Sequence, residues 1–205
     1  MSLTDALVLV LDDDASFRRA VERLLASAGL SVVPFASVPE FFQAEPPAGP
    51  ACLVLDVRMP GVNGLELQER LTTMEPPMPI IFLTGYGTVP MSVQAMKAGA
   101  IDFLLKPCDD QVLLDAVYRA LVQAEKVWRA HMEQRTVHDR LVTLTPRERS
   151  VLVMVTTGML NKQVAGALGM SEKTVKVHRA RIMQKMRAAS LADLVRMADK
   201  VGLSA

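Results

Sequence analysis

Cys52-Leu53-Val54-Leu55-Asp56 is an apolar run that ends in an aspartate, and this pattern decides the fold of the first half of the chain. A short apolar run of this kind indicates a buried strand. Three further runs share the pattern and end in polar side chains: Leu7 to Leu11 before Asp12-Asp13, Ile80 to Leu83 before Thr84, and Phe103 to Leu105 before Lys106-Pro107. If these strands are parallel in one sheet, their carboxyl ends meet at one edge, where open α/β sheets bind their ligands.

The side chains expected at that edge are three carboxylates, a hydroxyl and an ammonium. Mg²⁺ prefers oxygen ligands, and the carboxylates of Asp13 and Asp56 can supply them directly. An ammonium such as that of Lys106 can donate to a phosphoryl oxygen. The alternative is that each acidic residue only forms a turn or lies in a solvated loop. Because four matching strand ends follow one another, we favour a site for a divalent cation and a phosphoryl group, with one of the carboxylates as the phosphoryl acceptor.

Taken in order, the same residues resemble a known family. The segments that carry the resemblance, within residues 5–123, are Asp12-Asp13, Asp56-Val57-Arg58-Met59-Pro60-Gly61, Asn63-Gly64, Thr84-Gly85, Lys97-Ala98-Gly99-Ala100, Phe103 and Lys106-Pro107. This set is similar to the receiver domain of bacterial two-component response regulators. The resemblance implies a doubly wound, flavodoxin-like α/β domain with a five-stranded parallel sheet over residues 1–123.

The resemblance also implies how the metal is held. Asp13 and Asp56 are expected to bind Mg²⁺, Asp12 to hold it through water, and Arg58 to contribute its backbone carbonyl oxygen. Lys106 is expected to contact the phosphoryl group once it is on Asp56.

Switching is implied to depend on Thr84 and Phe103. A phosphoryl group adds negative charge at the edge, so the Thr84 hydroxyl and its loop are expected to move toward it, and Phe103 to fill the space left behind. The alternative for Phe103 is an ordinary ring in the core or on an edge strand. Pro107 matches the family's cis-proline. Tyr86 is bulky and comes two residues after Thr84, and our hypothesis is that it shields the acyl phosphate from water.

Composition indicates two domains and an anionic partner. The 205 residues exceed one typical domain, and no apolar run approaches the length of a membrane helix. Two cysteines are too few for a disulfide framework, so we expect reduced thiols and a cytoplasmic protein. Residues 1–125 carry 8 Lys and Arg against 16 Asp and Glu, a net charge of −8, whereas residues 126–205 carry 15 against 6, a net charge of +9. The basic second half therefore predicts an anionic partner.

The basic half has the layout of a helix-turn-helix domain. Thr145-Pro146-Arg147-Glu148 predicts a helix start with a capping box, and that helix is expected to end near Gly158. Further helices are expected over 161–168, ended by Gly169, then from 171 to about 188 and from 190 to about 201. A short helix, a glycine-containing turn and a longer basic helix follow one another, which is typical of helix-turn-helix proteins.

Helical spacing divides the third of these helices into an inner stripe and an outer face. The inner stripe is expected to hold Val175, His178, Ile182 and Met186. The outer face is predicted to bind double-stranded DNA, with phosphate contacts for affinity and base contacts for specificity. The alternative is a solvated basic face on a packing helix. The residues predicted at base edges are Lys176 and Val177, with Arg179 and Ala180 beside them, and those predicted at phosphates are Lys162, Lys173, Thr174 and Arg181.

A second resemblance covers this half. The segments that carry it are Leu144-Thr145-Pro146-Arg147-Glu148, Asn161-Lys162-Gln163-Val164-Ala165 and Ser171-Glu172-Lys173-Thr174-Val175-Lys176-Val177-His178. They are similar to the four-helix LuxR-type helix-turn-helix DNA-binding domain, which we assign to residues 141–205. The whole chain thus resembles a NarL/FixJ-type response regulator of the FixJ-like branch. Residues 124–140 are expected to form a long helical linker, with a flexible linker as the alternative.

The two resemblances imply a transcriptional regulator. A sensor histidine kinase is expected to phosphorylate Asp56, after which the receiver forms a homodimer and places two DNA-binding domains on paired half-sites. Release of a receiver that covers the recognition helix is an alternative route, and RNA polymerase is a further candidate partner. The rival interpretations are a protein-interaction module and an enzyme. We expect that the protein is not an enzyme, because the sequence offers no paired nucleophile and base beyond the phosphoacceptor site.

Overall fold

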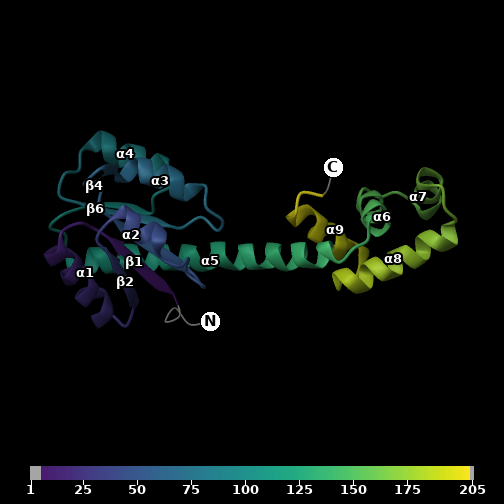
Figure 1. Cartoon of the computed structure of the whole chain (residues 1–205), viewed down its shortest axis with the longest axis horizontal. Coiled ribbons are helices and arrows are strands. Elements are labelled where there is room, and N and C mark those ends of the chain that lie inside the picture. The colour runs from purple at the N-terminus through teal and green to yellow at the C-terminus, as the bar shows by residue number, and fades with distance from the viewer. Residues whose placement is uncertain (1–5, 204–205) are drawn as a thin grey trace. The chain divides into compact units, whose positions relative to one another are not determined.

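The computed structural model describes residues 6–203. After Arg129 the chain divides into two compact units, which we call unit 1 and unit 2. Unit 1 is an α/β structure, and unit 2 is built from helices alone over its described residues (Figure 1). Within residues 6–203, no helix is both long and apolar enough to cross a membrane.

Unit 1 is built on a parallel sheet with the strand order β2-β1-β3-β6-β7. The strands are β1 (Leu7–Leu11), β2 (Ser31–Phe35), β3 (Ala51–Leu55), β6 (Ile80–Thr84) and β7 (Asp102–Leu105). Every residue of β3 and β6 is buried, because a parallel sheet covered on both faces needs apolar side chains on both sides. This is the five-stranded sheet that the resemblance implied.

Helices cover both faces of the sheet. One face packs against α1 (Ala15–Ser27) and the first part of α5 (Asp110–Val142), and the other against α2 (Val38–Gln43), α3 (Gly64–Thr72) and α4 (Val89–Lys97). The chain leaves β1 for β2 on one side, and β3 lies on the other side. The doubly wound order therefore opens a crevice at the carboxyl ends of β1 and β3.

Three strands of unit 1, β2, β4 (Arg58–Met59) and β5 (Val62–Asn63), lie outside the four apolar runs. The edge strand β2 alternates between exposed and half-buried positions and contains Pro34, a residue that sheets accept at their edges. Directly after Asp56, β4 and β5 form a short antiparallel hairpin. Its turn includes Gly61, whose φ of 78° favours glycine.

Unit 2 holds the four helices that the sequence predicted. They are α6 (Pro146–Thr156), α7 (Asn161–Leu168), α8 (Glu172–Met186) and α9 (Leu191–Lys200). The predicted capping box of Thr145 and Glu148 is present at the start of α6. Gly169 follows α7 with a φ of 63°, as expected for a helix that ends at a glycine.

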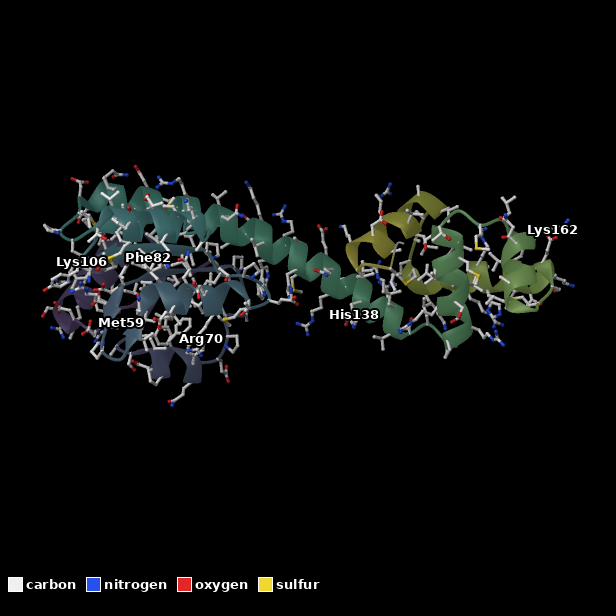
Figure 2. The ribbon with its side chains drawn as sticks, turned by 90° about the horizontal axis from the view of Figure 1, so that it is seen from above. Met59, Arg70, Phe82, Lys106, His138 and Lys162 are labelled. Atoms are coloured by element: carbon white, nitrogen blue, oxygen red, sulfur yellow. The ribbon has the colours of Figure 1, made fainter. Side chains whose placement is uncertain are left out.

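Helix α5 continues well beyond the residues that cover the sheet. It is helical through Val142, which confirms a helical rather than a flexible connection. Its last turns belong to unit 2, where Val137 and Leu141 are buried in one apolar cluster with Val151 and Ile182. His138, which Figure 2 labels, lies between them in sequence and is exposed.

Candidate functional site

Three carboxylates meet at the carboxyl edge of the sheet in unit 1. Asp12 and Asp13 follow β1, and Asp56 follows β3, whose Leu55 is paired in register with Leu11. Because these strand ends are neighbours, carboxylate oxygens of all three residues lie within 4.8 Å of one another. Asp12 is 3% exposed and Asp56 is 9% exposed, whereas Asp13 faces solvent. The acidic cluster predicted from the strand ends is therefore present in the structure.

Lys106 completes the cluster from the end of β7 (Figure 2). Its ammonium donates to Asp12 and to Asp56, with 2.7 Å between Nζ and Oδ2 of Asp56, and it lies 4.0 Å from the ring centroid of Phe17. Its backbone N–H donates to the carbonyl oxygen of Thr84, and the peptide bond to Pro107 is cis, as the resemblance implied. The ammonium is thus held between two carboxylates at one position.

Burial and charge act in opposite directions on these groups. Burial by itself would lower the pKa of Lys106, but the hydrogen bonds and charges of Asp12 and Asp56 outweigh it and raise that pKa. The pKa of Asp12 is raised, chiefly by burial and also by the charge of Asp56, although the Lys106 ammonium acts to lower it. Asp12, Asp56 and Lys106 thus form a compact group of charges that is largely shielded from solvent.

The carboxylates fit a hard divalent cation. Mg²⁺ takes oxygen ligands and keeps several waters, so it needs only a few protein oxygens on one side. The acidic cluster of Asp12, Asp13 and Asp56 offers such oxygens, and the exposed Asp13 leaves room for water. The backbone N–H of Arg58 donates to Oδ1 of Asp56 at 3.1 Å, which folds the following loop back over the aspartate.

The loop after Asp56 is held by close backbone packing at Gly64. The N–H of Gly64 donates to the carbonyl oxygen of Val57 at 2.7 Å. A Cβ at position 64 would lie 2.7 Å from the carbonyl oxygen of Asp56 and 2.8 Å from Cα of Val57. Since both are backbone atoms, no side chain can be placed there without moving the acceptor loop.

Thr84 and Phe103 lie on neighbouring strands, β6 and β7. Thr84 is fully buried, and its hydroxyl accepts a hydrogen bond from the backbone N–H of Tyr86 at 3.3 Å. Phe103 is half-buried, with its ring centroid 5.8 Å from that of the buried Phe82. A Cβ on Gly87 would lie 2.8 Å from Cε1 of Phe103. The loop after Thr84 therefore packs directly against the Phe103 ring.

One contact at this edge was missed from the sequence. The Arg58 guanidinium lies 4.6 Å from the ring centroid of Tyr86, in cation–π geometry. Arg58 comes two residues after Asp56 and Tyr86 two residues after Thr84, so each follows a site residue at the end of a neighbouring strand. That equal offset was the available signal. The pair thus joins the loop that follows β3 to the loop that follows β6.

In unit 2 the predicted DNA-contacting residues lie mostly at the surface. Val175, Ile182 and Met186 are buried, so the opposite face of α8 is turned outward. His178, placed on the inner stripe, is half-buried, and its Nδ1 is buried without a hydrogen-bond partner. The exposed members of the predicted set are Lys173, Thr174, Lys176, Val177, Ala180 and Arg181 from α8 and Lys162 from α7, the last of which Figure 2 labels.

Arg179 differs from its neighbours on α8. It is half-buried, and its Nη1 donates to Oδ1 of Asn161 at 2.8 Å. The guanidinium therefore ties α8 to the first residue of α7 and sets how the two helices of the turn are spaced.

Comparison with known proteins decides the family. Residues 8–118 match the response regulator receiver domain, and residues 142–198 match the LuxR family of bacterial regulatory proteins. The chain belongs to the NarL/FixJ-type response regulators. This response regulator combines the receiver as unit 1 with a LuxR-type DNA-binding domain in unit 2, and it is a transcriptional regulator.

Several relatives match this response regulator over most of their own length. It is 49% identical over 202 residues to nodulation protein W of Bradyrhizobium diazoefficiens, covering 98% of this chain and 89% of the relative. It is 44% identical to the transcriptional regulatory protein FixJ of Azorhizobium caulinodans, covering 96% and 93%. Among solved structures, the response regulator StyR is 46% identical with a TM-score of 0.79, covering 95% of this chain and 98% of StyR.

Proposed function

We propose that a sensor histidine kinase phosphorylates Asp56 and thereby switches DNA binding by the LuxR-type domain. The observation that carries this proposal is the meeting of Asp12, Asp13, Asp56 and Lys106 at one edge of the receiver sheet. The acceptor carboxylate is partly dehydrated, and an ammonium is within hydrogen-bonding distance. These are the groups that an in-line phosphoryl transfer requires of its acceptor.

In the proposed transfer, a carboxylate oxygen of Asp56 attacks the phosphorus of a phosphohistidine on the kinase. The new P–O bond forms as the P–N bond breaks, and the imidazole nitrogen keeps the electron pair. Lys106 changes partner from the Asp56 carboxylate to a phosphoryl oxygen, as a charge-assisted donor. Mg²⁺, held by Asp12, Asp13, Asp56 and the Arg58 carbonyl, would neutralise phosphoryl charge. This chemistry serves switching, and we propose no metabolic reaction.

The route from Asp56 to the surface runs through Thr84 and Phe103. The phosphoryl group offers the Thr84 hydroxyl a strong acceptor. Because the loop after Thr84 packs against the Phe103 ring, a shift of that loop changes the space that the ring can fill. Exposed apolar side chains on α4 and β7, among them Val93, Met96 and Leu105, are available for a receiver homodimer.

A receiver homodimer would raise DNA affinity by joining two reading modules. Each α8 would enter a major groove, with Lys176 and Val177 near base edges and Lys162, Lys173 and Arg181 near phosphates. Two linked modules bind paired half-sites far more tightly than one, because the second contact is intramolecular. RNA polymerase recruited beside such a site is the proposed downstream partner.

Binding to fragmented genomic DNA tests this function. Full-length protein is measured with and without beryllofluoride and Mg²⁺, which mimic the phosphoaspartate, beside Asp56→Asn and the surface control Asp115→Asn. We expect discrete enriched sites that require the mimic, in wild type and in Asp115→Asn but not in Asp56→Asn. Equal enrichment in all samples would remove phosphorylation as the control, and no enrichment in any sample would contradict DNA binding.

A further inference from the structure

Unit 1 contains an apolar cavity that includes none of the residues of the acidic cluster. It has a volume of about 160 Å³, and Leu7 and Leu9 of β1 and Val33 and Phe35 of β2 line it. The loops that follow α2 and α3 border it, with Pro46 and Pro47 in the first loop and Met74 and Met78 in the second. A smaller cavity of about 70 Å³ shares these four residues as a wall. The phosphorylation chemistry uses neither cavity.

Aromatic rings form one side of the larger cavity. Phe35, Phe41 and Phe42 all line it, and they are half of the six phenylalanines in the chain. The Phe35 and Phe41 rings, and the Phe41 and Phe42 rings, each meet edge to face at 5.3 Å between centroids. The Arg70 guanidinium lies 4.7 Å from the Phe42 ring centroid, and Figure 2 labels this arginine. The three rings thus contact one another in edge-to-face geometry, and Arg70 contacts the outermost of them.

The cavity is open to solvent through apolar side chains. Phe42 is 41% exposed, Met74 is 37% exposed and Val33 is 36% exposed. Apolar surface in contact with water is unfavourable, so an apolar occupant would stabilise this region by removing it from water. Methionine side chains adapt to what they contact, so Met74 and Met78 can adjust around an occupant.

Size and charge select the class of occupant. An enclosed, engineered cavity of about 150 Å³ lined by Leu, Ile and Phe binds benzene, and this cavity has a similar volume but is open on one side. A ring placed against Phe41 or Phe42 could adopt the edge-to-face arrangement that aromatic pairs prefer. The carboxylate of Glu45, also in the lining, disfavours an anion. We infer that this cavity is a binding site for a small uncharged molecule with a single aromatic ring.

Methionine methyl groups provide a direct test in the full-length protein. The chain is labelled with ¹³C at its methionine methyls and titrated with benzene, and the Met74 and Met78 signals are assigned from Met74→Leu and Met78→Leu. We expect saturable shifts of these two signals with a dissociation constant of about 1 mM or below, as for a ligand of six heavy atoms. The Met96 methyl on α4 should not shift, and benzoate should bind at least about tenfold more weakly because of its charge.

Two tryptophan variants separate the cavity from the loop that carries it. Ala44 lines the cavity, whereas the exposed Ala48 of the same loop does not. Ala44→Trp should fill the cavity and abolish the shifts, and Ala48→Trp should leave them unchanged. If the unliganded methyl spectrum shows that Ala44→Trp does not fold, Val33→Trp on the edge strand fills the same space. The inference is overturned if neither methyl shows a saturable shift, if Met96 shifts equally, if cyclohexane binds as tightly as benzene, or if a folded cavity-filling variant still binds.

Discussion

The carboxyl edge of the receiver sheet and the outer face of α8 present their polar side chains in opposite ways. At the edge, Asp12 and Thr84 are buried, and Lys106 is held between two carboxylates. On α8, Lys176 and its basic neighbours are exposed to solvent. A transfer reaction needs groups fixed in position and partly dehydrated, whereas a DNA-reading face meets a partner that brings its own charge and water. How strongly a functional side chain is held thus follows from what it has to do.

The largest effect should come from removing the acceptor carboxylate at the carboxyl edge of the receiver sheet. Asp56→Asn keeps the size of the side chain but lacks an ionised oxygen, so incorporation of phosphate from a phosphorylated kinase or a small phosphodonor should be abolished. Phosphate incorporation is measured on denaturing gels. Asp115→Asn, on the surface of α5, should behave as wild type. Residual labelling of Asp56→Asn above about 1% of wild type would place the acceptor elsewhere.

Two exposed lysines of unit 2, Lys176 on α8 and Lys162 on α7, should affect DNA binding in different ways. Lys176→Ala is expected to weaken binding to the preferred DNA site by about 1–3 kcal/mol and to relax the preference for sequence at one position. Lys162→Ala is expected to weaken binding to all sequences alike and to lower the salt slope by about 1. Titrations of specific and scrambled duplexes at several salt concentrations distinguish them. Identical effects of the two substitutions would show that Lys176 does not read bases.

Unit 2 also contains a buried charge, the carboxylate of Glu148, which is paired with an ammonium as Asp12 and Asp56 are in the receiver. Glu148 is 2% exposed, accepts from the Lys185 ammonium at 2.7 Å and caps α6 through the Thr145 backbone N–H. Glu148→Gln removes this charge and should lower the free energy of unfolding of unit 2 by about 1–2 kcal/mol. Urea unfolding of the full-length protein measures it.

The Glu148 contribution should depend on pH with a definite sign. The Lys185 ammonium, and then the Thr145 N–H, hold the pKa of Glu148 below its ordinary value of 4.5. The unfolded chain therefore binds a proton first as the pH falls, and the stabilisation that is complete above about pH 5 is lost through the folded-state pKa. The difference between wild type and Glu148→Gln should accordingly be larger at pH 6.5 than at pH 4. A difference that grows toward pH 4 would contradict the assignment.

The smallest effect concerns the Arg58–Tyr86 pair, which lies in the loops at the carboxyl edge of the receiver sheet. Tyr86→Ala removes a ring that lies against the Arg58 guanidinium and, by our hypothesis, keeps water from the acyl phosphate. If the contact with Arg58, worth about 0.5–1 kcal/mol, is what keeps the ring over the acyl phosphate, removal of the ring should make loss of phosphate from Asp56 about two- to fivefold faster. The lifetime of the labelled protein measures this, with Tyr118→Ala on α5 as the control. A Tyr86→Ala lifetime equal to that of wild type would refute the shielding role.

Much of the site could be predicted because strand ends are local signals. The apolar runs before Asp12, Asp56, Thr84 and Lys106 are continuous, and parallel pairing brings their ends to one edge without further information. The helices of unit 2 were equally accessible, since Thr145 and Gly169 mark helix ends through local backbone chemistry.

The features that were missed depend on tertiary neighbours. Strand β2 contains Pro34, which cannot donate a backbone hydrogen bond and weakens the strand signal of its apolar neighbours. The contact between Arg58 and Tyr86 joins loops 28 positions apart in the chain, and only the adjacency of β3 and β6 brings them together. The burial of Val137 and Leu141 likewise depends on the helices they meet, since the sequence around them is polar.

Pro34 on the edge strand has a consequence for how the protein behaves at high concentration. The carbonyl oxygen of Phe35 accepts from the Asp12 N–H, so the backbone groups of Phe35 point toward β1. Polar groups of successive strand residues alternate in direction, and the nitrogen of Pro34 therefore points outward. A strand from another molecule would find no donor there, so the open margin of the sheet is a poor template for fibril growth.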